Sequence, residues 1–269
     1  MSRLSTSKLR FRKLARRFKG LGEFVRIQKP VTRLLGPQYR RSRSQIELDI
    51  TWLCNLSCPH CNRSCPQAPT TEHLSLSAIA GFLDDSRARD LRWERIRLLG
   101  GEPTLHPQFP EVLDLLHAYW LWSGQTVVEL ATNGTGARVK RTLATLPDWL
   151  AVDDTDKSKG IDHFVPFNRA PMDRPIYRAT DKRNACWVAQ NCGMGFGPGG
   201  YYPCGPAAGI DRVFGFDVGR PELPGEQDDM EDLLELFCSR CGGFQREVGR
   251  PTSDTEMSVS WKEAYARRS

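Results

Sequence analysis

The feature that most constrains this chain is the placement of its nine cysteines. Four lie within the twelve residues from Cys54 to Cys65, and five lie between Cys186 and Cys241. The N-terminus is charged from Arg3 onward and has no apolar run typical of a secretory signal, which predicts a cytoplasmic protein. In a reducing compartment, thiols grouped in this way indicate metal ligands rather than disulfides. Two groups of cysteines therefore predict two metal centres.

The first group has the spacing C-x3-C-x2-C, formed by Cys54, Cys58 and Cys61. Three thiolates on one short loop can hold an iron–sulfur cluster and leave its fourth iron without a protein ligand. The alternative is a structural zinc loop in which Cys65 or His60 is the fourth ligand. The spacing alone leaves both interpretations open.

The polarity pattern predicts repeated strand–helix units in which the distinctive motifs follow strands. Apolar and polar residues alternate from Ile46 to Trp52, which is typical of a strand ending just before Cys54. The later units are a helix over 76–83, a strand over 96–99 that leads into Gly100-Gly101-Glu102-Pro103, a helix over 110–119, a strand over 127–130 that leads into Thr132-Asn133-Gly134, and weaker strands over 150–152 and 163–165. Such units predict a parallel sheet or barrel with its site at the carboxyl ends of the strands.

The cysteine loop after the first strand and the Gly-Gly-Glu-Pro turn after the second resemble the radical S-adenosylmethionine (SAM) superfamily, over residues 45 to about 180. The resemblance implies an α/β fold, a partial (β/α)6 TIM-like barrel, and a [4Fe–4S] cluster on Cys54, Cys58 and Cys61. It implies reductive cleavage of SAM to a 5′-deoxyadenosyl radical that abstracts hydrogen from substrate. An external one-electron donor of the flavodoxin or ferredoxin type is then required.

The resemblance also implies a set of SAM-binding residues. Glu102 accepts hydrogen bonds from the SAM ammonium group, and the two glycines before it remove Cβ atoms that would block close approach. His60 stands at a position that is usually aromatic in the family and lies near the adenine. The turn at Thr132 and Asn133 binds the ribose or sulfonium region, although a plain Asn-Gly turn explains it as well. The full set is His60, Gly100, Gly101, Glu102, Thr132 and Asn133.

The second cysteine group resembles the twitch domain, a truncated SPASM domain of certain radical SAM enzymes. Its elements are Cys186, Cys204 and the later C-x2-C pair Cys238 and Cys241. The resemblance implies that these four thiolates hold one auxiliary [4Fe–4S] cluster, and a zinc ribbon is the alternative. Two thiols then remain as candidate hydrogen-atom donors or inert buried groups, namely Cys192 and Cys65.

The chain divides into an arm over 1–43, a radical SAM region over 44–180 and a small C-terminal cluster-binding appendage over 181–269. The arm carries fourteen Lys and Arg against one acid, although the whole chain has a net charge of +6. Its apolar residues from Leu4 to Val25 follow helical spacing. Such a helix packs on its own protein or contacts an anionic surface or partner.

Taken together, the two resemblances imply net oxidation of an unactivated C–H centre in a small polar substrate, carbohydrate-like or aminocyclitol. An epimerase with a cysteine hydrogen donor and a peptide-modifying enzyme are alternatives, and a zinc-binding RNA-contact protein is a distant one. Polar residues near the last predicted strands are candidates for the pocket wall: Asp154, Lys157, His163, Asn168, Arg169 and Asp173. No run of residues is long and apolar enough for a transmembrane helix.

Overall fold

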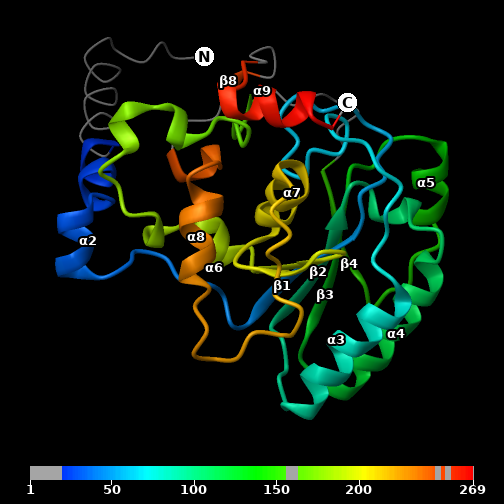
Figure 1. Ribbon diagram of the computed structural model, residues 1–269. Coiled ribbons are helices and arrows are strands. Elements are labelled where there is room, and N and C mark those ends of the chain that lie inside the picture. The colour runs from blue at the N-terminus through cyan, green and yellow to red at the C-terminus, as the bar shows by residue number, and fades with distance from the viewer. Residues whose placement is uncertain (1–19, 156–162, 246–249, 252–255, 269) are drawn as a thin grey trace, which may run out of the picture.

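A six-stranded sheet forms the centre of the computed structural model, which describes residues 20–155, 163–245, 250–251 and 256–268 (Figure 1). Its strands are β1 (Gln45–Thr51), β2 (Arg95–Gly100), β3 (Val127–Thr132), β4 (Ala151–Asp154), β6 (Met194–Gly197) and β7 (Gly200–Tyr202). The helices are α2 (Lys29–Leu35), α3 (Leu76–Ala88), α4 (Phe109–Ser123), α5 (Ala137–Leu143), α6 (Trp187–Asn191), α7 (Gly205–Phe214), α8 (Glu231–Cys238) and α9 (Val259–Ala266). Two short strands, β5 (His163–Phe164) and β8 (Arg250–Pro251), pair separately.

Local sequence explains where these elements begin and end. In β1, the side chains of Ile46, Leu48 and Ile50 are all fully buried, as the alternating pattern predicts. The Ser75 hydroxyl caps α3 by accepting a hydrogen bond from the backbone N–H of Ala78 at 3.1 Å. Helix α4 ends at Gly124, which adopts the left-handed conformation that favours glycine.

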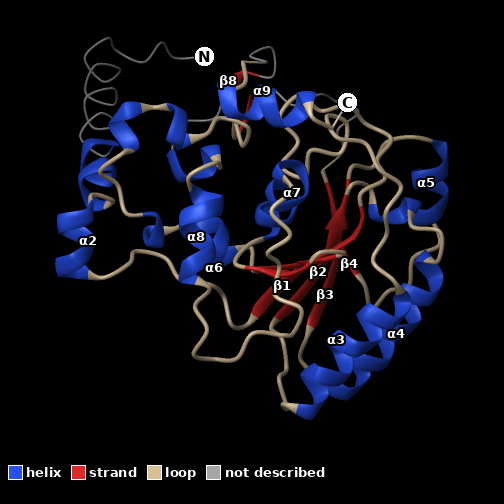
Figure 2. Cartoon of the chain, in the orientation of Figure 1, coloured by secondary structure: helices blue, strands red, loops and turns tan. Residues whose placement is uncertain are grey.

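The sheet has the strand order β4-β3-β2-β1-β6-β7. Every neighbouring pair from β4 to β6 is parallel, and β7 pairs antiparallel with β6. Helices α3, α4 and α5 lie on one side of the sheet, and α7 lies on the other (Figure 2). The carboxyl ends of β1, β2 and β3 therefore meet at one edge, which brings the motifs that follow them together.

The predicted sixfold barrel differs from this arrangement. Four strands follow one another in the sheet, but β5 pairs with β8 instead of continuing it. The chain then crosses to the other edge, where β6 pairs with β1. The described strands therefore form an open, mostly parallel sheet. The backbone groups of β1 that a closing barrel strand would bind are already hydrogen-bonded to β6.

The described residues after 180 contribute to the main sheet and to its core. They supply β6 and β7 to the main sheet, and Met194, Phe196 and Trp261 among them belong to the same hydrophobic core as Ile46 and Leu48. A chain of this size buries its apolar surface best in one continuous core. The two cysteine regions are therefore built on a shared scaffold.

A second, smaller core joins the N-terminal segment to the C-terminal region. Ile27 is 2% exposed and packs with Tyr177, Leu234 and Phe244. Most of the predicted arm helix, from Leu4 to Phe18, lies outside the described residues. Within the described part, Leu21 and Val25 of the predicted apolar stripe are exposed at 60% and 47%. In this part of the arm the packing on the protein is made by Ile27 and by the Phe24 ring, which meets Tyr177 edge to face.

None of the described helices is long and apolar enough to cross a membrane.

Candidate active site

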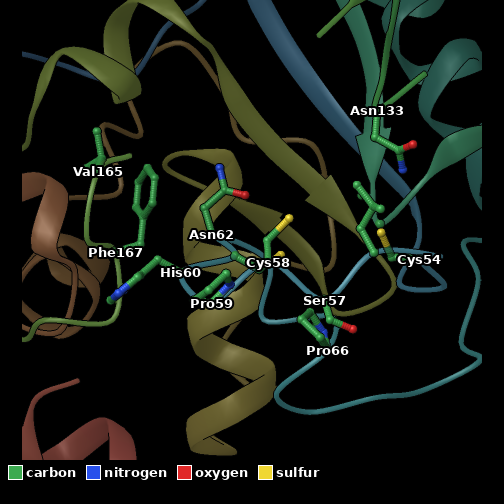
Figure 3. A pocket seen from close by; sticks show the side chains of 14 residues that line it. Cys54, Ser57, Cys58, Pro59, His60, Asn62, Pro66, Asn133, Val165 and Phe167 are labelled. Atoms are coloured by element: carbon green, nitrogen blue, oxygen red, sulfur yellow. The ribbon is translucent and has the colours of Figure 1, made fainter. Parts of the chain in front are cut away.

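A cavity of about 450 Å³ opens between the loop after β1 and the turns after β2 and β3. Figure 3 shows Cys54 below Asn133 on one side of this cavity, with Val165 and Phe167 on the other. The lining residues are Cys54, Leu56, Ser57, Cys58, Pro59, His60, Cys61, Asn62, Pro66, Gly100, Gly101, Asn133, Val165 and Phe167. The volume falls in the usual range of small-molecule sites, about 300–1,000 Å³. All three thiols of the first cysteine group therefore face one cavity of cofactor size.

The two glycines of the Gly-Gly-Glu-Pro turn allow the backbone at the end of β2 to lie directly against the backbone at the end of β1. A Cβ at Gly101 would lie 2.1 Å from the Leu53 carbonyl oxygen, and one at Gly100 would lie 2.1 Å from that of Thr51. In this close approach, the N–H of Gly101 donates to the Thr51 carbonyl at 2.7 Å. The close packing of the backbone thus requires both glycines, and this packing holds the turn against the start of the cysteine loop.

Glu102 is fully buried and joins two turns of the site. Its Oε1 accepts hydrogen bonds from the hydroxyls of Thr104 at 2.7 Å and Thr132 at 2.9 Å. Its Oε2 accepts one from the backbone N–H of Asn133 at 2.8 Å. The structure therefore brings together Glu102, Thr132 and Asn133, three of the predicted SAM-binding residues. An ionised carboxylate with several donors is a rigid, charge-assisted anchor.

Asn133 also connects the third turn to the cysteine loop. Its side-chain amide donates to the side-chain oxygen Oδ1 of Asn55 at 2.9 Å, and the side-chain amide of Asn55 donates to the Thr135 backbone carbonyl at 2.6 Å. The sequence patterns did not single out Asn55, although its position directly after Cys54 was the available signal. This amide pair fixes the entrance of the loop.

His60 lines the cavity and is held by Asn168. Its Nδ1 donates a hydrogen bond to the Asn168 side-chain oxygen, and the Asn168 amide donates to the Pro59 carbonyl at 3.3 Å. Asn168 is one of the polar residues named near the last predicted strands, and it is 1% exposed. The imidazole therefore has a fixed orientation at the cavity wall, opposite the turns after β2 and β3.

The fourth cysteine of the first group contacts the third. The Cys65 thiol donates a hydrogen bond to the Cys61 sulfur, which lowers the pKa of Cys61 and raises that of Cys65. Burial raises the pKa of Cys54. Cys65 is 4% exposed and belongs to the main hydrophobic core, and it does not line the described cavity.

The second cysteine group converges from three helices. Cys186 precedes α6, Cys204 precedes α7, and Cys238 ends α8 three residues before Cys241. Burial and the charges of the neighbouring thiols raise the pKa of Cys204 and of Cys238. A Cβ at Gly243 would lie 3.4 Å from the Cys241 sulfur and 3.8 Å from the Cys186 sulfur. The four predicted auxiliary ligands are therefore neighbours.

Cys192 does not line the cavity of the first cysteine group. It ends α6, and the next residue, Gly193, packs so closely on the start of β1 that a Cβ would lie 2.6 Å from the Gln45 carbonyl oxygen. The cysteine loop follows the other end of β1, and seven strand residues span about 20 Å. Burial raises the pKa of the Cys192 thiol to about 11.

Within the described ranges, no three His, Cys, Asp or Glu side chains are arranged to chelate a single metal ion. A cubane cluster distributes its ligands over separate iron atoms, so this finding concerns single-ion sites only.

The amino-acid sequence is similar to those of a group of known enzymes. The chain is 31% identical over 112 residues to the GTP 3′,8-cyclase of Mannheimia succiniciproducens, covering 41% of this chain and 32% of that one. It is 30% identical over 156 residues to the GTP 3′,8-cyclase of Chlorobaculum tepidum, covering 55% and 43%. The chain thus spans less than half the length of these relatives. No model of a known protein family matches it.

Among solved structures, the chain is similar to BtrN in complex with AdoMet and 2-DOIA, with a TM-score of 0.43 and 15% identity over 77% of this chain and 90% of that one.

The fold and the cavity define an α/β enzyme whose site lies at the carboxyl ends of parallel strands. Over the matched residues the chain is similar to enzymes, the cyclases. The resemblance of the cysteine loop and the Gly-Gly-Glu-Pro turn to the radical SAM superfamily implies a [4Fe–4S] cluster and SAM as cofactors.

Proposed function

We propose that this enzyme oxidises an unactivated C–H centre of a small polar substrate, carbohydrate-like or aminocyclitol, with the help of a second [4Fe–4S] cluster. The observation that carries the proposal is the convergence of Cys186, Cys204, Cys238 and Cys241. The group lies near the cavity wall, since a Cβ at Gly243 would contact both the Cys241 sulfur and the Phe167 ring. Four thiols saturate a cluster, and a saturated cluster is suited to electron transfer rather than to substrate binding.

The residues of the cavity fit the implied cofactors. Cys54, Cys58 and Cys61 face a space large enough for a small molecule and leave a fourth position without a thiol. When bound, the cluster and SAM supply a radical that takes a hydrogen atom from the substrate, and a second cluster supplies an acceptor for the electron that remains. The reductant is an external one-electron donor of the flavodoxin or ferredoxin type.

The chain's own side chains then orient SAM and exclude water. Glu102 presents a fixed negative charge behind the turn after β2, where the SAM ammonium is expected. His60, held by Asn168, supplies a planar wall for the adenine. The apolar side chains of Val165 and Phe167 cover the outer side of the cavity and keep the reacting carbon dry.

One observation favours oxidation over epimerisation, and a second favours a polar substrate. The Cys65 thiol already donates to Cys61, and Cys192 lies at the far end of β1, so neither is aimed at the cavity. In addition, the face of the sheet opposite α3 and α4 is polar. There Arg97 pairs with Glu129 and Asp153, and the Asp153 side chain is 44% exposed. Charged groups at this position suit a hydroxylated or amino-substituted ligand.

Metal analysis tests the proposal. The full chain, reconstituted without oxygen, should contain about eight irons, four per cluster. Replacing Cys54, Cys58 and Cys61 together by Ala should remove half of the iron, and replacing Cys186, Cys204, Cys238 and Cys241 should remove the other half. Zinc in place of iron in the second group would contradict the proposed oxidation.

A further inference from the structure

A buried ion cluster lies between the two cysteine groups. Its centre is Arg63, two residues after Cys61, whose side chain is 3% exposed. The guanidinium donates from Nε to Asp49 Oδ1 at 3.0 Å and from Nη2 to Glu47 Oε2 at 2.8 Å. Both carboxylates stand on β1 and are buried. One positive and two negative side chains are thus removed from water beneath the cysteine loop.

Helix α7 seals this ion cluster from the other side. A Cβ at Gly205, the residue after Cys204, would lie 2.1 Å from Glu47 Oε2 and 2.2 Å from Arg63 Nη2. One turn later, a Cβ at Gly209 would lie 3.0 Å from the Arg63 Cα. One turn further, the Arg212 guanidinium donates to the Arg63 carbonyl at 2.9 Å. In Figure 1, α7 accordingly lies between the sheet and α8.

The contacts make Arg63 the link between the two groups. Its backbone belongs to the loop that carries Cys61, and its guanidinium touches the helix that begins after Cys204. The second oxygen of Asp49, Oδ2, is buried and has no hydrogen-bond partner in the described part of the chain. Glu47 also pairs with Arg97, whose Nη1 lies 3.5 Å from Oε1, whereas the ion pair of Asp49 in the described part of the chain is with Arg63.

A buried charge acts strongly on a nearby redox centre, since low polarity screens it poorly. A positive charge favours the reduced form, and an uncompensated carboxylate disfavours it. We infer that Arg63 is a positioning residue that docks the first cysteine loop onto α7 and sets the reduction potentials of the clusters at both cysteine groups. This inference rests on the proposed function, because it requires iron–sulfur clusters at these thiols.

Potentiometry of the reconstituted full chain tests the inference, with the reduced clusters followed by EPR at about pH 8, where Asp49 is ionised. Arg63→Met should lower the potentials, and Asp49→Asn should raise them. Each substitution should change the equilibrium constant for cluster reduction about tenfold, which corresponds to a shift in potential of about 59 mV for a one-electron couple. Opposite signs are the decisive feature, because general disturbance of the loop would move both variants in one direction. The matched control is Arg87→Met on α3, which should leave the potentials unchanged.

Each outcome separates this inference from the proposed function. If the unmodified chain takes up no iron in either group, the proposed function fails. If it holds both clusters but the two variants leave the potentials unchanged, or shift them in the same direction, the role of Arg63 is refuted. Arg63→Lys keeps the charge, so it should restore the potential if Arg63→Met assembles its clusters incompletely.

Discussion

The carboxylate of Glu102 accepts a hydrogen bond of 2.8 Å from the backbone N–H of Asn133, which ties the turn after β2 to the turn after β3. This bond spans two strands of the sheet at the edge where the cavity opens. Glu102 is also fully buried, so its charge is weakly screened. The residue thus has two roles to separate, one in holding the turns and one in attracting a cation.

Replacing Glu102 by Gln should weaken SAM binding by about 1–3 kcal/mol, because the charge that attracts the ammonium is lost while the size is kept. Calorimetry with SAM on the iron-loaded protein measures this change. The exposed Glu111→Gln on α4 is the control and should bind as the unmodified chain does. Equal affinity in both variants would remove Glu102 from the SAM site.

Replacing Gly101 by Ala should destabilise the fold by about 1–3 kcal/mol, because the new methyl group meets the Leu53 carbonyl oxygen at 2.1 Å. Chemical denaturation of the metal-free protein measures the loss. At Gly81 on α3, a methyl group would have no neighbouring atom within 4 Å, so Gly81→Ala should stabilise the helix by up to about 1 kcal/mol. A neutral Gly101→Ala would mean that the turn does not need this close approach.

The stability of the metal-free protein should depend on Asp49. Burial raises the pKa of Asp49 from 3.8 to about 6. The folded state therefore holds the proton more tightly than the unfolded state. The resulting stability is fully present below about pH 4 and is lost as the pH rises through about 6.

The substituted side chain in the variant Asp49→Asn stays neutral throughout. The free energy of unfolding of this variant, relative to that of the unmodified chain, should therefore rise by about 3 kcal/mol between about pH 4 and pH 7. Urea denaturation across that range measures the difference. Asp84→Asn, whose side chain is 72% exposed, should show no such gain. If the difference in unfolding free energy between Asp49→Asn and the unmodified chain stays constant across this pH range, Asp49 is already ionised at the lower pH.

Turnover in deuterated water should place no deuterium at the reacting carbon, because oxidation needs no hydrogen donor from the protein. Mass spectrometry of the product reads this directly. Cys65→Ala and Cys192→Ala should both keep the product unchanged. Deuterium that appears in the product and disappears with either substitution would instead establish epimerisation.

The sequence predicted the parts of this protein that depend on short stretches. The alternation from Ile46 to Trp52 correctly predicts a strand and the spacing from Leu76 to Leu83 correctly predicts a helix, although in β1 the polar face is buried as well as the apolar one. The motifs after β1, β2 and β3 were expected to meet, and they do, because parallel strands end at the same edge.

The parts that the sequence did not predict depend on distant contacts. Nothing local to Arg63 indicates that its partners are Glu47 and Asp49. The pairing of β6 with β1 was also not predicted, since Met194 to Gly197 is too short and glycine-rich to read as a central strand. In the arm, an apolar stripe alone could not tell which side would find a partner.

The position of β6 has a consequence for how the chain matures. While β1 to β4 have emerged and Met194 to Gly197 have not, the backbone groups of β1 that later pair with β6 remain open. An unpaired strand of this apolar character is a template for aggregation. Pairing over such a sequence separation is also slow. A truncated form that stops before β6 should therefore precipitate, and loading of iron at Cys54, Cys58 and Cys61 should be efficient only after the C-terminal strands have closed the sheet.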